Sequence, residues 1–180
     1  MLPSQAAIVP HAAQPHFEIG NLLRAHHALS IFVCRLRDFT LCRELYGQHV
    51  TEEIENLLMT ALGTCGQTNP AVQSGHALRI GHGEALLLRS MSALGEEHLM
   101  DQAFSLKMAL QAVLRRHTIP SLGREFDIEV GFSILHESPP MEKERLLHEA
   151  IGDARRMAQG NVNLEAIKLS SVFRSIVRNG

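Results

Sequence analysis

The sequence predicts one α/β domain, in which helices flank a mixed β-sheet that contains an antiparallel hairpin. Ile31 to Cys34 form a compact apolar run of the kind found in strands buried on both faces. Two apolar segments separated by Gly81 to Glu84 predict the hairpin. The stretches between them carry apolar residues at helical spacing. With 180 residues, 45% of them hydrophobic, the chain suits a single compact core.

The first elements follow from composition and spacing. Residues 1–16 are rich in Ala, Pro and His without a sustained period, which predicts a flexible leader before a domain over 17–180. Phe17 to Leu29 is expected to form a short helix, and Ser30 to Leu36 a central strand.

Two consecutive helices are predicted after this strand. Apolar residues recur at helical spacing from Phe39 to Leu62, with a break at Tyr46-Gly47-Gln48. Thr51, followed by two glutamates, looks like the N-cap of the second helix. The glycines, Asn69 and Pro70 between residues 63 and 70 predict a long turn.

The second half begins with the hairpin, whose strands are expected over 76–80 and 85–88. An apolar stripe from Leu99 to Leu114 predicts a core-facing helix that ends near His117. Alternating apolar residues predict a half-buried strand over 126–135, and a helical face follows from Leu146 to Ala158. Residues 162–180 fit either a strand with a short helix or one helix.

Composition excludes several classes of function. Seventeen basic and nineteen acidic residues leave a charge of -2, which lacks the basic footprint of a nucleic-acid-binding protein. The sequence shows neither a secretion signal nor an apolar stretch of about 18 to 20 residues, so we expect a cytoplasmic protein without membrane insertion. Cys34, Cys42 and Cys65 have no CxxC spacing and are expected to be free and buried. The eleven histidines show no metal-binding spacing.

Three segments resemble the GGDEF domain of diguanylate cyclases over about residues 29–163, and they follow one another in the same order as in that family. The first is Arg79-Ile80 followed by five residues where the family has its signature on a hairpin tip. Those five residues are Gly81, His82, Gly83, Glu84 and Ala85. The resemblance implies the three-layer sandwich of nucleotidyl cyclases.

The other two segments lie on either side of the signature. Arg35-Leu36-Arg37-Asp38-Phe39, with Tyr46-Gly47-Gln48 after it, is similar to the family's strand ending in Asp-x-Asp-x-Phe-Lys and its later Gly-His pair. Residues 130–134, Val-Gly-Phe-Ser-Ile, with Leu146-Leu147 and Ala150, are similar to the family's Ser-Ile-Gly strand and following helix.

The departures from the family pattern concern its metal and nucleotide sites. The two family carboxylates that hold divalent cations fall on Arg35 and Gly83, and hard cations need oxygen ligands. The family's guanine-recognising Asn falls on Arg43, and the Asp partner on Glu52. His82 replaces the second signature glycine. The resemblance therefore implies loss of catalysis, with no metal and no cofactor.

Some residues keep two interpretations. Glu84 is either a surviving general base or a solvated hairpin carboxylate. Arg35, Arg37 and Arg43 either bind an anionic ligand or form surface ion pairs with Asp38, Glu44 and Glu52. His82 is either a pH-sensitive contact or simply exposed. The full set of candidate nucleotide or anion contacts is Arg35, Arg37, Phe39, Arg43, Glu52 and Arg79.

The sequence thus predicts an inactive, non-enzymatic GGDEF-like regulatory domain that acts through protein contacts in bacterial signalling related to cyclic di-GMP. Expected partners are a GGDEF, EAL or other signalling protein, or a second copy of the chain. The alternative is a metal-independent sensor that binds GTP or another phosphorylated nucleotide in the former active-site cleft. A divergent hydrolase using Glu84 and nearby histidines is a third hypothesis.

Overall fold

The structure is a computed structural model that describes residues 28–68, 75–90, 97–116, 127–136, 139 and 141–159. The element order is β1 (Ala28–Leu36), α2 (Phe39–Thr68), β2 (Gly75–Gly81), β3 (Glu84–Ser90), α3 (Glu97–Arg116), β4 (Ile128–His136) and α4 (Lys143–Gln159). No helix among these residues combines the length and the apolarity needed to cross a membrane. The predicted leader at 1–16 and the segment 162–180 lie outside the described residues.

Four strands form one sheet in the order β2-β3-β1-β4. Each neighbouring pair is antiparallel, so the described sheet is antiparallel throughout, where the sequence predicted a mixed sheet. The strands of the β1-α2-β2 unit are separated by β3, and the strands of the β3-α3-β4 unit are separated by β1. Each unit is therefore a split βαβ arrangement. The predicted class, an α/β fold with a hairpin and flanking helices, is confirmed.

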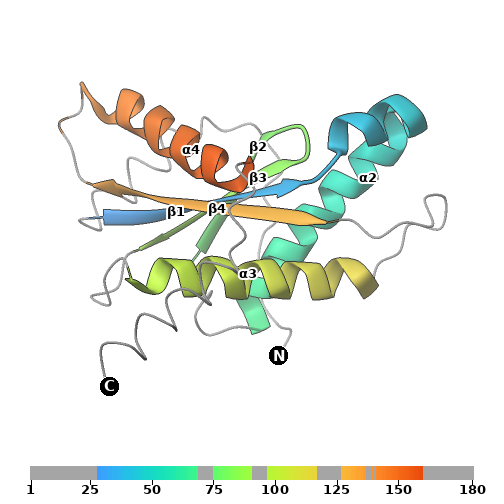
Figure 1. Ribbon diagram of the computed structural model, residues 1–180, viewed down its shortest axis with the longest axis horizontal. Coiled ribbons are helices and arrows are strands. Elements are labelled where there is room, and N and C mark those ends of the chain that lie inside the picture. The colour runs from blue at the N-terminus through green and yellow to red at the C-terminus, as the bar shows by residue number, and fades with distance from the viewer. Residues whose placement is uncertain are drawn as a thin grey trace, which may run out of the picture.

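Helices cover both faces of the sheet and give three layers (Figure 1). Because successive side chains of a strand point to opposite faces, β1 contributes to two cores. Phe32, Cys34 and Leu36 pack into the core shared with α2 and α3. Leu29, Ile31 and Val33 pack into the core under α4. The prediction that β1 is buried on both faces is confirmed, although the strand begins at Ala28, so Ala28 and Leu29 are not helical as expected.

The break predicted within the second element is confirmed at Gly47, where α2 kinks with a φ of 80°. Thr51 is not an N-cap, because its hydroxyl donates back to the Gln48 carbonyl oxygen at 2.8 Å from inside the helix. The helix also continues to Thr68, so residues 63–68 are helical rather than part of the expected turn. An exposed glycine within a helix is tolerated at about 1 kcal/mol, which explains why Gly63 does not end α2.

The remaining elements largely follow their predictions. The turn of the β2-β3 hairpin is at residues 82–83. Leu99, Ala103, Leu106, Leu110 and Leu114 form the predicted buried face of α3. The prediction that β4 is half-buried is wrong, because helices cover both of its faces: Val130 packs on the α3 side and Leu135 on the α4 side. Cys34 and Cys42 are buried as predicted and are not joined in a disulfide, whereas the side chain of Cys65 lies outside the described part.

Close approach of α4 to β4 is made possible by Gly131. A Cβ atom built on this glycine would lie 1.9 Å from the backbone oxygen of Ala154 and 2.6 Å from the nitrogen of Ala158. Ser133 fixes the same contact, since its hydroxyl donates to the Ala150 carbonyl oxygen at 2.7 Å. These contacts set the depth at which α4 lies and therefore the reach of its side chains toward the hairpin.

Candidate functional site

The last carboxylate of the signature, Glu84, is held by two arginines from different layers. Glu84 begins β3 and is the register partner of Arg35 on β1. Arg155 of α4 donates from Nε and Nη2 to Glu84 Oε2, at 2.9 and 2.7 Å. Arg35 Nε lies 3.7 Å from Glu84 Oε1. Only 13% of the Glu84 side chain is exposed, so the interpretation of a solvated hairpin carboxylate is wrong.

A second cluster of charges occupies the end of β1 next to β4. Arg37 Nη1 donates to Asp127 Oδ2 at 3.1 Å, and Arg37 Nε lies 3.4 Å from Glu129 Oε1. Gln111 of α3 donates to the other Asp127 oxygen at 3.0 Å. Arg35 therefore pairs with Glu84, and Arg37 pairs with Asp127 and Glu129.

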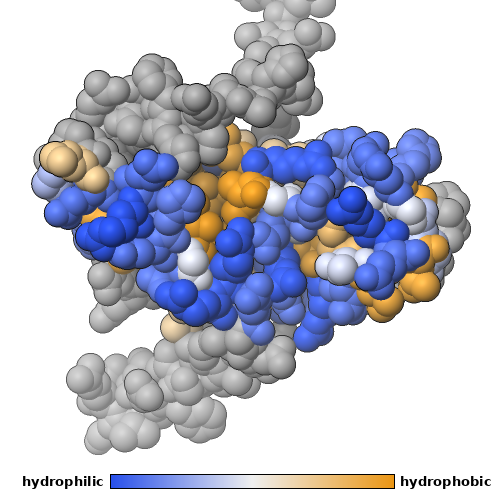
Figure 2. Space-filling model, turned by 90° about the horizontal axis from the view of Figure 1, so that it is seen from above, coloured by the Kyte–Doolittle hydropathy of each residue, from blue (hydrophilic) through white to orange (hydrophobic). Residues whose placement is uncertain are grey.

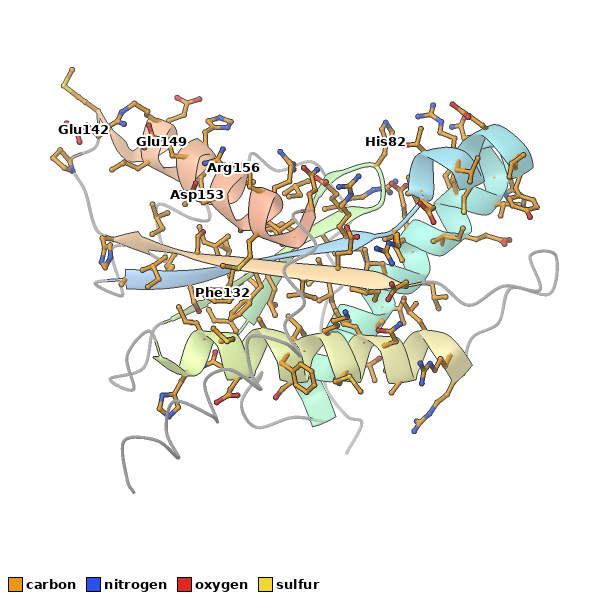
Figure 3. The ribbon with its side chains drawn as sticks, in the orientation of Figure 1. His82, Phe132, Glu142, Glu149, Asp153 and Arg156 are labelled. Atoms are coloured by element: carbon orange, nitrogen blue, oxygen red, sulfur yellow. The ribbon has the colours of Figure 1, made fainter. Side chains whose placement is uncertain are left out.

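The hairpin tip is fixed from below by Glu55, a buried carboxylate of α2 with 5% of its side chain exposed. Glu55 Oε1 accepts a hydrogen bond from the Gly83 backbone N–H at 2.7 Å, and Oε2 pairs with the Arg79 guanidinium. His82 Nδ1 lies 3.8 Å from Glu55 Oε1, although 73% of the His82 side chain is exposed (Figure 3). His82 is thus both exposed and next to a carboxylate.

Sequence reasoning missed Glu55, although the helical pattern contained a signal for it. Thr51, Ile54, Leu58 and Ala61 are buried, and Glu55 follows Thr51 by four residues and precedes Leu58 by three. Positions three and four apart share one helix face, so Glu55 falls on the buried stripe of α2. A carboxylate at such a position predicts a specific partner, because a buried charge has to be paired.

Gly83 is required by both the turn and its neighbour. Its φ is +71°, which favours glycine, and a Cβ atom would lie 2.5 Å from Phe39 Cγ. Phe39, a predicted nucleotide contact, is only 7% exposed and belongs to the core. The backbone N–H of Leu36 donates to the Gly83 carbonyl oxygen at 2.9 Å, which ties the turn to the end of β1.

The structure brings the predicted residues together in two groups. Arg35 joins Glu84, while Arg79, His82 and Gly83 gather around Glu55. Arg43 and Glu52 are exposed on α2, and Glu52 accepts a hydrogen bond from Gln48 at 2.8 Å. Among the described residues, no group of three or more His, Cys, Asp or Glu side chains is arranged to hold a metal.

The face seen from the α4 side is mostly hydrophilic, with apolar atoms showing in patches between the polar side chains (Figure 2). The polar outer side of α4 explains this surface, since Glu149, Asp153 and Arg156 are exposed there. Arg155 is different, because its side chain points from the same helix into the contact with Glu84. The arrangement brings the side chains of α4, β1 and β3 together at one carboxylate.

No protein-family model matches the sequence, and no curated protein is significantly similar to it. Solved structures with a similar fold include the active GGEEF domain of a diguanylate cyclase from Vibrio cholerae, with a TM-score of 0.55 and 14% identity over 82% of this chain and 85% of that one. The GGDEF domain of TpbB (YfiN) from Pseudomonas aeruginosa gives a TM-score of 0.60 and 15% identity, over 84% and 86% of the two chains.

A third similar structure is the GGDEF domain of DgcB from Caulobacter crescentus, which was solved in complex with c-di-GMP. Its TM-score is 0.52 and its identity 11%, over 81% of both chains. At such identities the comparison shows the fold and leaves function to the site itself. The chain has the fold of the GGDEF domains of diguanylate cyclases, as the sequence predicted.

Proposed function

We propose that the chain is a catalytically inactive GGDEF-like regulatory domain of the bacterial cytoplasm. It works through protein contacts in signalling related to cyclic di-GMP. One observation carries the proposal: Glu84, the carboxylate that remains in the signature, is bound by Arg155 and Arg35. In that environment the carboxylate is an ion-pair partner. Both of its oxygens face guanidinium groups, so neither oxygen is directed at a site for a metal cation.

The electrostatics of the neighbouring positions support the same proposal. Arg35 is where the resemblance places the first metal-binding carboxylate, and Gly83 is where it places the second. Cyclisation of a nucleoside triphosphate needs divalent cations that neutralise the charge developing on the transferred phosphoryl group. A guanidinium at one ligand position repels a cation, and a glycine at the other supplies no oxygen ligand from a side chain.

The test of inactivity is an assay of the purified protein with GTP and either Mg²⁺ or Mn²⁺. We expect no cyclic di-GMP above the background of a heat-denatured sample, while an active cyclase assayed in parallel forms product. Cyclic di-GMP formation that scales with protein concentration contradicts the proposal.

The test of a protein-contact role is a titration of the chain into reactions of an active diguanylate cyclase or a cyclic di-GMP phosphodiesterase. We expect a saturable change in the turnover of one partner, together with complex formation measured by analytical ultracentrifugation. A chain that neither self-associates nor changes the turnover of any enzyme in such a panel does not act in the proposed way.

The competing function is metal-independent nucleotide sensing. The ion pairs of Arg35, Arg37 and Arg79 argue against nucleotide sensing, because their guanidinium groups are already paired with carboxylates of the chain. A nucleotide phosphate would have to displace at least one of these carboxylates. Calorimetry with GTP and related nucleotides, without metal, separates the two functions, since the regulatory domain is expected to give no binding heat.

A further inference from the structure

The outer face of α3, the helix that lies across the lower face of the sheet in Figure 1, lacks charged residues along most of its length. Between Asp101 and Arg115, the exposed positions are Ser105, Met108 and Ala112. Met108 is 47% exposed and is the large apolar residue that the described part of α3 leaves exposed. An amphipathic helix normally places charged and polar residues opposite its buried stripe, so this neutral stretch is unusual for a face in contact with water.

The exposed residues of this face form one row along the helix. They are Asp101, Ser105, Met108, Ala112 and Arg115, and successive members are alternately four and three residues apart. This is the spacing of the contact seam between two packed helices, because it keeps every member on the same side of the helix. We call these five residues the outer row of α3. The row extends about 10 Å on either side of Met108.

The two ends of the outer row carry opposite charges at equal distances from its centre. Asp101 precedes Met108 by seven residues, and Arg115 follows Met108 by seven. In an antiparallel pair of α3 helices centred on Met108, Asp101 of each copy therefore meets Arg115 of the other. Arg116 adds a positive charge at the same end as Arg115, and the half-buried Lys107 lies outside the row. Asp101 and Arg115 also interact within the chain, but both remain exposed, and exposed ion pairs are weak enough to exchange.

We propose that the outer row of α3 is a self-association surface, on which two copies of the chain pack their α3 helices antiparallel about a two-fold axis at Met108. Such an interface uses the same residues of both copies. The small side chains of Ser105 and Ala112 allow the helices to approach closely, and the flexible Met108 fills the centre. One helix pair is smaller than a standard interface, so the dimer is weak and reversible. This inference rests on the proposed function and names a second copy as the partner.

The experiment reverses the two charges of the outer row, first singly and then together. Sedimentation velocity over a range of concentrations measures the self-association of the wild type, of Asp101→Arg, of Arg115→Asp and of the double variant. We expect the wild type to dimerise, and each single variant to dimerise at least about fivefold more weakly, because the two-fold axis creates two contacts between like charges. The double variant should recover the association of the wild type, since both pairs are restored with their signs exchanged.

An equimolar mixture of the two single variants tests the antiparallel pairing directly. Asp101→Arg leaves only positive charges at the ends of the row, and Arg115→Asp leaves only negative ones. The two variants should therefore form a mixed dimer at least as stable as the dimer of the wild type. The control is Arg145→Asp, which reverses an exposed charge on α4 and should leave self-association unchanged. A mixture that associates no more strongly than the single variants overturns the proposal, and so does an equal loss in Arg145→Asp.

A second variant keeps the test valid if a charge reversal unfolds the chain. Met108→Lys places a charge at the two-fold axis, where the residue meets its own copy, and it should weaken the dimer as strongly as Asp101→Arg. Unchanged association of a folded Met108→Lys overturns the proposal. A wild type that stays monomeric overturns it as well, even if Asp101→Arg then abolishes the effect of the chain on a cyclase or phosphodiesterase, because the face would bind another protein. The proposed function fails only if the titration into those enzymes also shows no effect.

Discussion

At the scale of single residues, the role of each glycine and each charged side chain in the candidate site depends on the residues that it contacts. Gly83 illustrates this, because the sequence alone presents it as a signature residue that lost its carboxylate. In the structure it is a left-handed turn residue in contact with the ring of Phe39. Any side chain at this position therefore meets two obstacles, backbone strain and steric overlap.

Replacing Gly83 with Asp, which restores the signature carboxylate, is expected to lower the free energy of unfolding by roughly 3 kcal/mol. The cause is the positive φ together with the ring of Phe39, which a Cβ atom would overlap. Urea denaturation measures the change. Gly63→Ala is the control, since a Cβ atom there meets nothing within 4 Å, and it should stabilise the helix by up to about 1 kcal/mol. A fully stable Gly83→Asp contradicts the packing of the turn.

Glu55 and Arg79 make a pair whose members differ in burial, which predicts unequal effects of removing them. Arg79→Gln leaves a buried carboxylate with 5% exposure, and we expect a loss of about 2 kcal/mol. Glu55→Gln leaves Arg79 with 46% of its side chain exposed to water, and the new amide oxygen can still accept from Gly83, so about 1 kcal/mol is expected. Chemical denaturation of both variants checks this order, and the reverse order contradicts it.

At the scale of elements, the packing of α4 on β4 depends on Gly131, a strand position without a side chain. The Ala154 carbonyl and the Ala158 nitrogen lie where the Cβ atom of a larger residue at 131 would stand. The helix backbone offers no flexible group that could move aside. The contact therefore sets the spacing between two layers, and through it the position of Arg155.

Gly131→Ala is expected to destabilise the protein by roughly 3 kcal/mol, because overpacking against backbone atoms forces α4 away from the sheet. Thermal unfolding gives the loss, and faster hydrogen exchange in α4 should accompany it. Gly152→Ala, on the same helix, is the control. Its Cβ atom would only approach Arg156 Nη1 at 3.6 Å, so stability should stay the same or rise by up to about 1 kcal/mol. Equal effects of the two substitutions contradict this account.

At the scale of the whole molecule, the charges at the hairpin end of the sheet link elements that the hydrophobic cores leave in separate layers. Arg155 ties α4 to β3, Glu55 ties α2 to the hairpin, and Arg37 ties β1 to Asp127 and β4. Ion pairs that are partly shielded from water contribute more than exposed pairs, which are screened and flexible. The hairpin end is therefore held by charge as well as by apolar packing.

Arg155→Gln should lower the free energy of unfolding by about 2 kcal/mol, because Glu84 keeps only the longer contact with Arg35. The matched control is Arg145→Gln, which removes the exposed pairs of Arg145 with Glu142 and Glu149. Such exposed pairs contribute about 0.3–0.5 kcal/mol each. Guanidinium is unsuitable for this comparison because it screens charges, so urea denaturation is the measurement. Similar losses in the two variants contradict a special role for Arg155.

The order of elements and their faces could be read from the sequence, because both depend on local information. The apolar run of β1, the glycines of the hairpin and the stripe of α3 follow from the periods of strand and helix. The boundaries were less accurate where two signals competed. Gly63 to Thr68 looked like a turn, yet they continue α2, and Thr51 looked like a cap, yet it lies inside the helix.

Only the tertiary structure decided how the charged residues pair. The sequence placed Arg35 correctly in its strand and put Glu84 in the hairpin turn, one residue outside the strand that it begins. Arg155 was not among the candidates, and Glu55 was hidden among apolar positions of α2. Partners such as Arg155 and Glu84 are 71 residues apart, and their meeting depends on strand register and on the depth of α4. Hydrophobic periodicity, a local property, thus determined the architecture, while long-range pairing of charges was fixed by packing between layers.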